Sequence, residues 1–214
     1  VGNEAMRFQF LSESEKLTDE EKGLYKQLIT IGGRGESTYV MEEDTLTGSL
    51  QTLSKLLQKH YEKSVVVLID EYDVPLQKAY VQEYYDQMVV LLRNFMDHVL
   101  KTNDSLKFAV LTGCMRISKE SIFTGLNNLR VLSVADVKFD EYFGFTDTEV
   151  KDLLEYYGLS DSYEKIREWY DGYRFGNVDV YCPWDVVNYC DVLCADPEAY
   201  PQNYWINTSS NDVV

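Results

Sequence analysis

The amino-acid sequence predicts an α/β fold for most of the chain, followed by a small, mainly helical extension. Three segments support this: an aliphatic run at 65–69, an amphipathic stretch over 83–101, and a second apolar run at 106–111. A strand, a helix and a second strand in this order form a βαβ unit, whose strands are parallel. We therefore expect an α/β core with parallel strands and flanking helices over residues 1–145, and the extension over 146–214.

Two amphipathic helices are predicted upstream of the first apolar run. Residues 18–21, Thr-Asp-Glu-Glu, have the order of a capping box, and apolar residues follow at helical spacing as far as Ile31. A second helix is predicted over 46–61, where apolar residues recur every three or four positions. The glycine-rich segment 32–38 between them is expected to be a loop.

The first apolar run contains only valine, leucine and isoleucine. A strand without polar alternation is typical of a parallel sheet, so we expect this strand to be buried on both faces. The amphipathic helix that follows carries its apolar residues between Met88 and Val99, and a polar turn at 103–105 precedes the second strand.

The extension is predicted to contain three helices. Residues 146–149, Thr-Asp-Thr-Glu, form a second capping box, and Gly158 is placed to end that helix. A further helix is expected around Ile166. After a short extended piece near 178–181, Pro183 stands where the first residue of a last helix would lie.

The charge and the apolar runs restrict the partners of this chain. Of its 214 residues, 36 are acidic and 20 basic, for a net charge of −16. Such a surface repels phosphate backbones, so we expect no direct nucleic-acid binding by the segment as a whole. The longest aliphatic runs, 65–69 and 88–92, are far shorter than the roughly 20 residues that span a bilayer, so no membrane partner is expected.

The cysteines and the chain ends bear on location and completeness. Four cysteines are too few for a disulfide scaffold, and they are expected to be reduced thiols in a cytoplasmic protein. The chain starts at Val1 without an initiator methionine or a signal peptide and stops on apolar residues, which favours a fragment of a longer protein.

Two acids directly follow the first predicted strand. In open α/β sheets ligands gather at the carboxyl ends of the strands, which is where Asp70 and Glu71 are expected. An apolar run followed by Asp-Glu is the Walker B arrangement, in which the first acid holds Mg²⁺ and the second polarises the water that attacks the γ-phosphate. The alternative is that these acids merely begin the loop after a buried strand.

The end of the second strand supplies further candidates. Thr112 stands where AAA-type nucleotide hydrolases often have a polar residue that senses the γ-phosphate, and Gly113 would allow close backbone approach there. Arg116 could stabilise phosphate charge, or it could simply begin a surface loop.

A phosphate-binding loop is missing from the sequence. No G-x-x-x-x-G-K-[ST] motif occurs, and the glycine cluster at 32–38 has Glu36 where a lysine would be needed. We therefore expect this segment alone to bind nucleotide weakly or not at all.

Four ordered motifs resemble the bacterial AAA-ATPase-like family. They are VVVLIDEYDVPL (65–76), FAVLTGCMRISKESIFTGLNN (108–128), FDEYFGFTDTEV (139–150), and WYDGYRFG with YCPWDVVNY (169–189). The resemblance implies the second half of a P-loop NTPase core with a winged-helix-like extension. It also implies an upstream Walker A segment and a downstream PD-(D/E)XK nuclease-like domain, both lacking here.

The resemblance further implies an ATPase that uses Mg²⁺ and ATP in the full-length parent. Asp70 and Glu71 match the Walker B acids, Thr112 matches the sensor position, and Arg116 lies in a matching motif. The two E-x-K sequences, 20–22 and 149–151, fall on predicted helices and not on the strand that a nuclease would use.

Two alternatives stay open at this point. A degenerate NTPase-like scaffold could bind a partner protein or form a homo-oligomer through its aromatic residues, which make up 14% of the chain and include 17 tyrosines. A metal-only hydrolase could instead use Asp70, Glu71 and Asp73.

Overall fold

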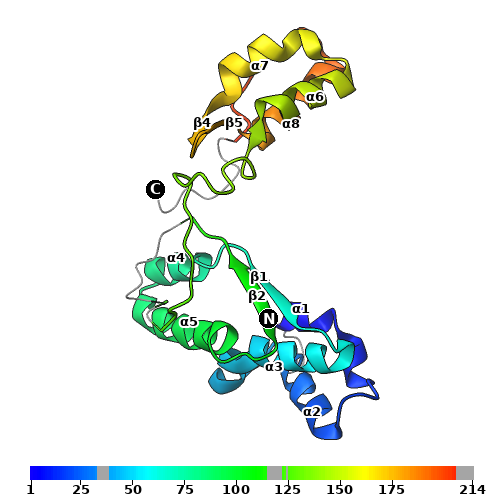
Figure 1. Cartoon of the computed structure of the whole chain (residues 1–214), viewed down its shortest axis with the longest axis vertical. Helices are drawn as coiled ribbons and strands as arrows, with labels where there is room; N and C mark the ends of the chain where they lie inside the picture. The colour runs from blue at the N-terminus through cyan, green and yellow to red at the C-terminus, as the bar shows by residue number, and fades with distance from the viewer. Residues whose placement is uncertain (33–38, 115–121, 124, 206–214) are drawn as a thin grey trace. The chain divides into compact units, whose positions relative to one another are not determined.

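The computed structural model describes residues 1–32, 39–114, 122–123 and 125–205. The chain divides into two compact units, Val1–Leu129 and Arg130–Val214 (Figure 1). In the described part of the chain, no helix is both long enough and apolar enough to cross a membrane. All four cysteines are free thiols.

The first unit begins with a helical layer. It contains α1 (Gly2–Met6), η1 (Gln9–Ser12), α2 (Asp19–Leu28) and α3 (Glu43–Tyr61). The predicted capping box forms, since the Thr18 hydroxyl accepts the Glu21 N–H and the Glu21 carboxylate accepts the Thr18 N–H. The buried core of this layer surrounds Tyr25, whose hydroxyl donates to the Ala5 carbonyl at 2.8 Å.

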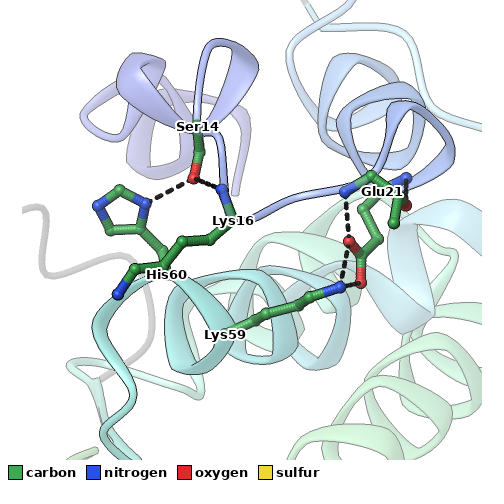
Figure 2. A network of polar contacts seen from close by, with 6 residues as sticks. Ser14, Lys16, Glu21, Lys59 and His60 are labelled. Atoms are coloured by element: carbon green, nitrogen blue, oxygen red, sulfur yellow. Dashed lines mark hydrogen bonds and ion pairs between the residues drawn. The ribbon is translucent and has the colours of Figure 1, made fainter.

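Polar contacts join the end of α3 to the residues that precede and begin α2 (Figure 2). The Lys59 ammonium lies 2.7 Å from the Glu21 carboxylate, and this contact, ahead of the Thr18 N–H, holds the pKa of Glu21 below its ordinary value. Buried Ser14 shares a 2.8 Å hydrogen bond with His60 Nδ1. These contacts fix α3, which leads directly into the first strand.

The two predicted strands are parallel neighbours. β1 (Val65–Ile69) pairs with β2 (Leu106–Leu111), and the register ends with Ile69 opposite Leu111. Between them lie α4 (Val74–Val81) and α5 (Tyr85–Leu100), so the predicted βαβ unit is confirmed, with one additional helix. α5 packs against β2 and α3 packs against β1.

The prediction that the first strand is buried on both faces is wrong. Val67 is buried, but Val66 and Leu68, on the other face, are exposed. Among the described residues the sheet has only two strands, and the helices that pack against it leave this second face open. An aliphatic run without polar alternation therefore does not show that both faces of a strand are buried, since one face of β1 is covered by no described residue.

The second unit combines helices with a small antiparallel sheet, in the order β3-β5-β4. Its elements are β3 (Phe145–Thr146), α6 (Asp147–Tyr157), η2 (Ser160–Ser162), α7 (Tyr163–Tyr170), β4 (Asp171–Phe175), β5 (Val178–Tyr181) and α8 (Pro183–Ala195). The three predicted helices are confirmed: α6 starts at the Thr146 capping box and ends at Gly158 with φ 69°, and Pro183 opens α8. The hairpin of β4 with β5 was not predicted.

Candidate functional site

Asp70 and Thr112 meet at the carboxyl ends of the two parallel strands. Pairing continues past the strand ends, because the Thr112 N–H donates to the Ile69 carbonyl at 2.9 Å. The Thr112 hydroxyl donates to Asp70 Oδ1. Both side chains were singled out from the sequence, and the structure brings them into direct contact.

Glu71 occupies a tight turn directly after Asp70. Its φ is 51°, in the left-handed region that a residue with a side chain seldom adopts. The turn is held by the Thr112 side chain, which accepts the Glu71 N–H at 3.3 Å, and by the Thr112 carbonyl, which accepts the Tyr72 N–H at 3.0 Å. The Glu71 carboxylate is exposed at this end of the sheet.

Asp73 lies beneath this turn and is 1% exposed. Its carboxylate accepts a hydrogen bond from Gln77 Nε2 at 3.1 Å. A Cβ atom on Gly113 would stand 2.8 Å from Asp73 Oδ1 and 2.6 Å from the Tyr72 ring, so a larger residue there would force one of these side chains to shift. Gly113 was expected to allow a close approach to the backbone, and the groups that lie close to it are the Tyr72 ring and the Asp73 carboxylate.

Asp73 was not among the predicted nucleotide-site residues. The sequence feature that could have identified it is its position between a strand and the start of a helix. α4 begins at Val74 and carries Pro75 in its first turn, where proline favours a helix start. That position accounts for its burial, because the chain turns there from the sheet into the helix. Arg116 and residues 33–38 of the glycine cluster at 32–38 lie outside the described residues.

Two of the three carboxylates at this end of the sheet are accessible. Asp70 and Glu71 are exposed and offer hard oxygen ligands, whereas the carboxylate of Asp73 is buried beside Gly113. Over the described ranges, no three His, Cys, Asp or Glu side chains gather so that they could hold a metal ion. Asp70, Glu71 and Asp73 therefore do not form the three-carboxylate metal site that the metal-only hydrolase would need, and the Asp73 carboxylate is buried.

Comparison with known proteins gives one family. Residues 4–123 match the AAA-ATPase-like family, described as predicted AAA-ATPase. A similar protein from Azotobacter chroococcum mcd 1, named as an uncharacterized protein in the vnfD 5′ region, is 35% identical over 149 residues. That alignment covers 68% of this chain but only 27% of the relative, so the chain spans about a quarter of the relative's length. No solved structure matches significantly.

Proposed function

Because the chain belongs to the AAA-ATPase-like family of predicted AAA-ATPases, we propose that the whole protein binds and hydrolyses ATP with Mg²⁺. In this proposal the first unit is the second half of a P-loop NTPase core, with Asp70 and Glu71 as its Walker B pair. The observation that carries it is the contact between the Thr112 hydroxyl and the Asp70 carboxylate at the ends of two parallel strands. Ligands of open α/β sheets bind at such ends.

Each residue of the site has a proposed role. Asp70 would hold Mg²⁺, which normally takes one or two protein carboxylates, water and substrate phosphates as ligands. When bound, the ion neutralises charge on the phosphate oxygens. The exposed Glu71 carboxylate would orient the attacking water and accept its proton, while Thr112 keeps the Asp70 carboxylate oriented.

The phosphate-binding loop would come from another part of the whole protein. The sequence has no Walker A motif, so the isolated chain is proposed to bind nucleotide weakly. Arg116 is proposed to contact phosphate charge. A nuclease-like domain downstream of this segment is a further proposal, and the length of the Azotobacter relative leaves room for one.

The test is to replace Glu71 with glutamine in the full-length protein and to measure both ATP binding and ATP hydrolysis. Loss of a general base lowers turnover by roughly 10²- to 10⁴-fold. Binding should be nearly unchanged, because the amide has the same shape and Asp70 is intact. Unchanged hydrolysis would remove Glu71 from the mechanism.

The chain offers a matched control at Glu83. It is also an exposed glutamate of the first unit with positive φ, 61°, but it lies between α4 and α5 rather than directly after a strand. Glu83→Gln should leave turnover unchanged. If the full-length protein neither binds nor hydrolyses ATP, the scaffold alternative replaces this proposal, and sedimentation would then establish whether copies associate.

A further inference from the structure

The ring of Tyr72 packs into the first unit from the turn at residues 70–73, which we call the site turn. It lies against a hydrophobic cluster of buried residues that includes Leu76 and Phe123. The Tyr72 and Phe123 rings meet edge-on, with centroids 5.3 Å apart and an interplanar angle of 70°. Edge-on aromatic pairs at this distance are favourable, so Phe123 holds the Tyr72 ring in place.

The same ring also lies against the backbone at Gly113, the residue after Thr112. A Cβ atom on Gly113 would stand 2.6 Å and 2.9 Å from two carbons of the Tyr72 ring. A large ring after β1 is therefore matched to a residue without a side chain after β2. Because protein interiors are close-packed, neither of the two can change in size without a shift of the other.

These contacts bear on the conformation of Glu71, the residue before Tyr72. With φ at 51°, Glu71 has a backbone conformation that persists only where the surrounding structure holds it. Its N–H donates to the Thr112 side chain at 3.3 Å, and its carbonyl accepts the Val74 N–H at 3.1 Å. The Tyr72 N–H donates to the Thr112 carbonyl at 3.0 Å. A shift of Tyr72 or of Gly113 therefore acts on the backbone that fixes the direction of the Glu71 side chain.

We propose that Tyr72 is a positioning residue for ATP hydrolysis, whose ring, packed against Phe123 and Gly113, holds the site turn so that the Glu71 carboxylate meets the attacking water. The inference rests on the proposed function and adds to it a residue that acts through Glu71. A displacement of about 1 Å at a reacting group can cost roughly 10²-fold in rate. ATP binding depends on Asp70 and on the phosphate-binding loop, so the ring acts on turnover.

The experiment compares Tyr72→Ala, Tyr72→Phe and Gly113→Ala in the full-length protein and measures kcat and KM for ATP. Tyr72→Ala should lower kcat by roughly 10- to 100-fold and leave KM within about threefold, as expected when a contribution made only in the transition state is lost. Tyr72→Phe keeps the ring and should retain most of the native kcat. Gly113→Ala presses a methyl group against the ring and should lower kcat, again without a matching rise in KM.

The control for lost packing is Val89→Ala. Val89 is 8% exposed and belongs to the same hydrophobic cluster, but it lies on α5 and not in the site turn. This variant removes buried volume and should leave kcat unchanged at a temperature where circular dichroism shows every variant to be folded. If Tyr72→Ala does not fold, the comparison of Gly113→Ala with Val89→Ala decides the question.

Three results would overturn the inference: a native kcat in Tyr72→Ala, a loss in Tyr72→Phe as large as in Tyr72→Ala, or an equal loss in Val89→Ala. A rise in KM with unchanged kcat would also overturn it, because the ring would then serve binding. Failure of the proposed function is a different result, in which the native full-length protein does not hydrolyse ATP or Glu71→Gln turns over at the native rate.

Discussion

Gly113 has little space around it in the candidate site. A methyl group there would stand 2.6 Å from the Tyr72 ring, and that ring cannot move freely because it packs edge-on against Phe123 at 5.3 Å. We expect Gly113→Ala to lower the free energy of unfolding by about 1–3 kcal/mol, the usual cost of overpacking. Urea unfolding of the purified chain measures this.

Gly48 is the matched control for that substitution. It lies inside α3, and a Cβ atom there would meet nothing within 4 Å. Gly48→Ala should therefore raise the free energy of unfolding by about 0.5–1 kcal/mol, because alanine favours the helix. Equal effects of the two substitutions would show that the space around Gly113 is not restrictive.

Asp147 makes the second unit sensitive to acid. Its carboxylate accepts hydrogen bonds from Lys151 at 2.6 Å, from the Tyr163 hydroxyl at 2.6 Å and from the Tyr181 hydroxyl at 3.0 Å. These donors, Lys151 foremost, lower the pKa of Asp147 from 3.8 to about 2. Because the folded state binds this proton less readily than the unfolded chain, the stabilisation is complete above about pH 4 and is lost as pH falls through about 2.

The expected outcome is a stability difference between the native chain and Asp147→Asn that is largest at neutral pH and shrinks between about pH 4 and pH 2. Tryptophan fluorescence during urea unfolding is a suitable readout, because Trp169, Trp184 and Trp205 are the only tryptophans and all lie in the second unit. A difference that stays constant over this range would contradict the role of the carboxylate.

Some of the site could be predicted residue by residue. The contact of Asp70 with Thr112 follows from two apolar runs that end in polar residues, since parallel strands align their carboxyl ends. The close packing of Asp73 against Gly113 could not be predicted, because Gly113 is distant in sequence but adjacent in the fold. Local pattern carries no information about such a neighbour.

At the scale of elements, the sequence predicted best those helices whose first residues form a capping box. In α2 the Thr18 hydroxyl accepts a hydrogen bond from the Glu21 N–H at 3.2 Å, and the Glu21 carboxylate accepts one from the Thr18 N–H at 2.7 Å. Thr18→Ala should lower the free energy of unfolding by about 1 kcal/mol. Thr18→Ser retains the hydroxyl and should lose only a small part of this, and an equal loss in both variants would argue against the cap.

The elements that were missed lack such signals. α4 is a single short helix directly after the site turn, and its start is marked by Pro75 but by no capping box. β4 reads Asp-Gly-Tyr-Arg-Phe, so its apolar alternation is limited to Tyr173 and Phe175 and is too short to predict a strand. It forms a strand because β5 pairs with it across a turn at Gly176, where φ is 52°.

At the scale of the whole molecule, the α/β class could be predicted from the sequence. Whether both faces of the β1–β2 sheet are buried could not. The same aliphatic run results whether the second face is buried by this chain or by something outside it, so the pattern at 65–69 could not distinguish the two. The domain boundary predicted after residue 145 stays a prediction.

The negative charge is unevenly distributed between the two units. Residues 130–214 carry 17 acidic and 6 basic side chains, whereas residues 1–129 carry 19 and 14. Among the described residues, the pair of Arg174 with Asp179 is exposed and contributes little, so we expect repulsion among the excess acids to decide how this unit responds to salt.

Salt should therefore stabilise the second unit. Raising the ionic strength from about 0.01 M to 0.15 M shortens the Debye length from about 30 Å to 8 Å, which screens the repulsion among its acids. We expect the unfolding midpoint measured by tryptophan fluorescence, which reports this unit alone, to rise with added NaCl. A midpoint that falls with salt would mean that the exposed ion pairs dominate, and sucrose at matched osmolality controls for effects that do not depend on charge.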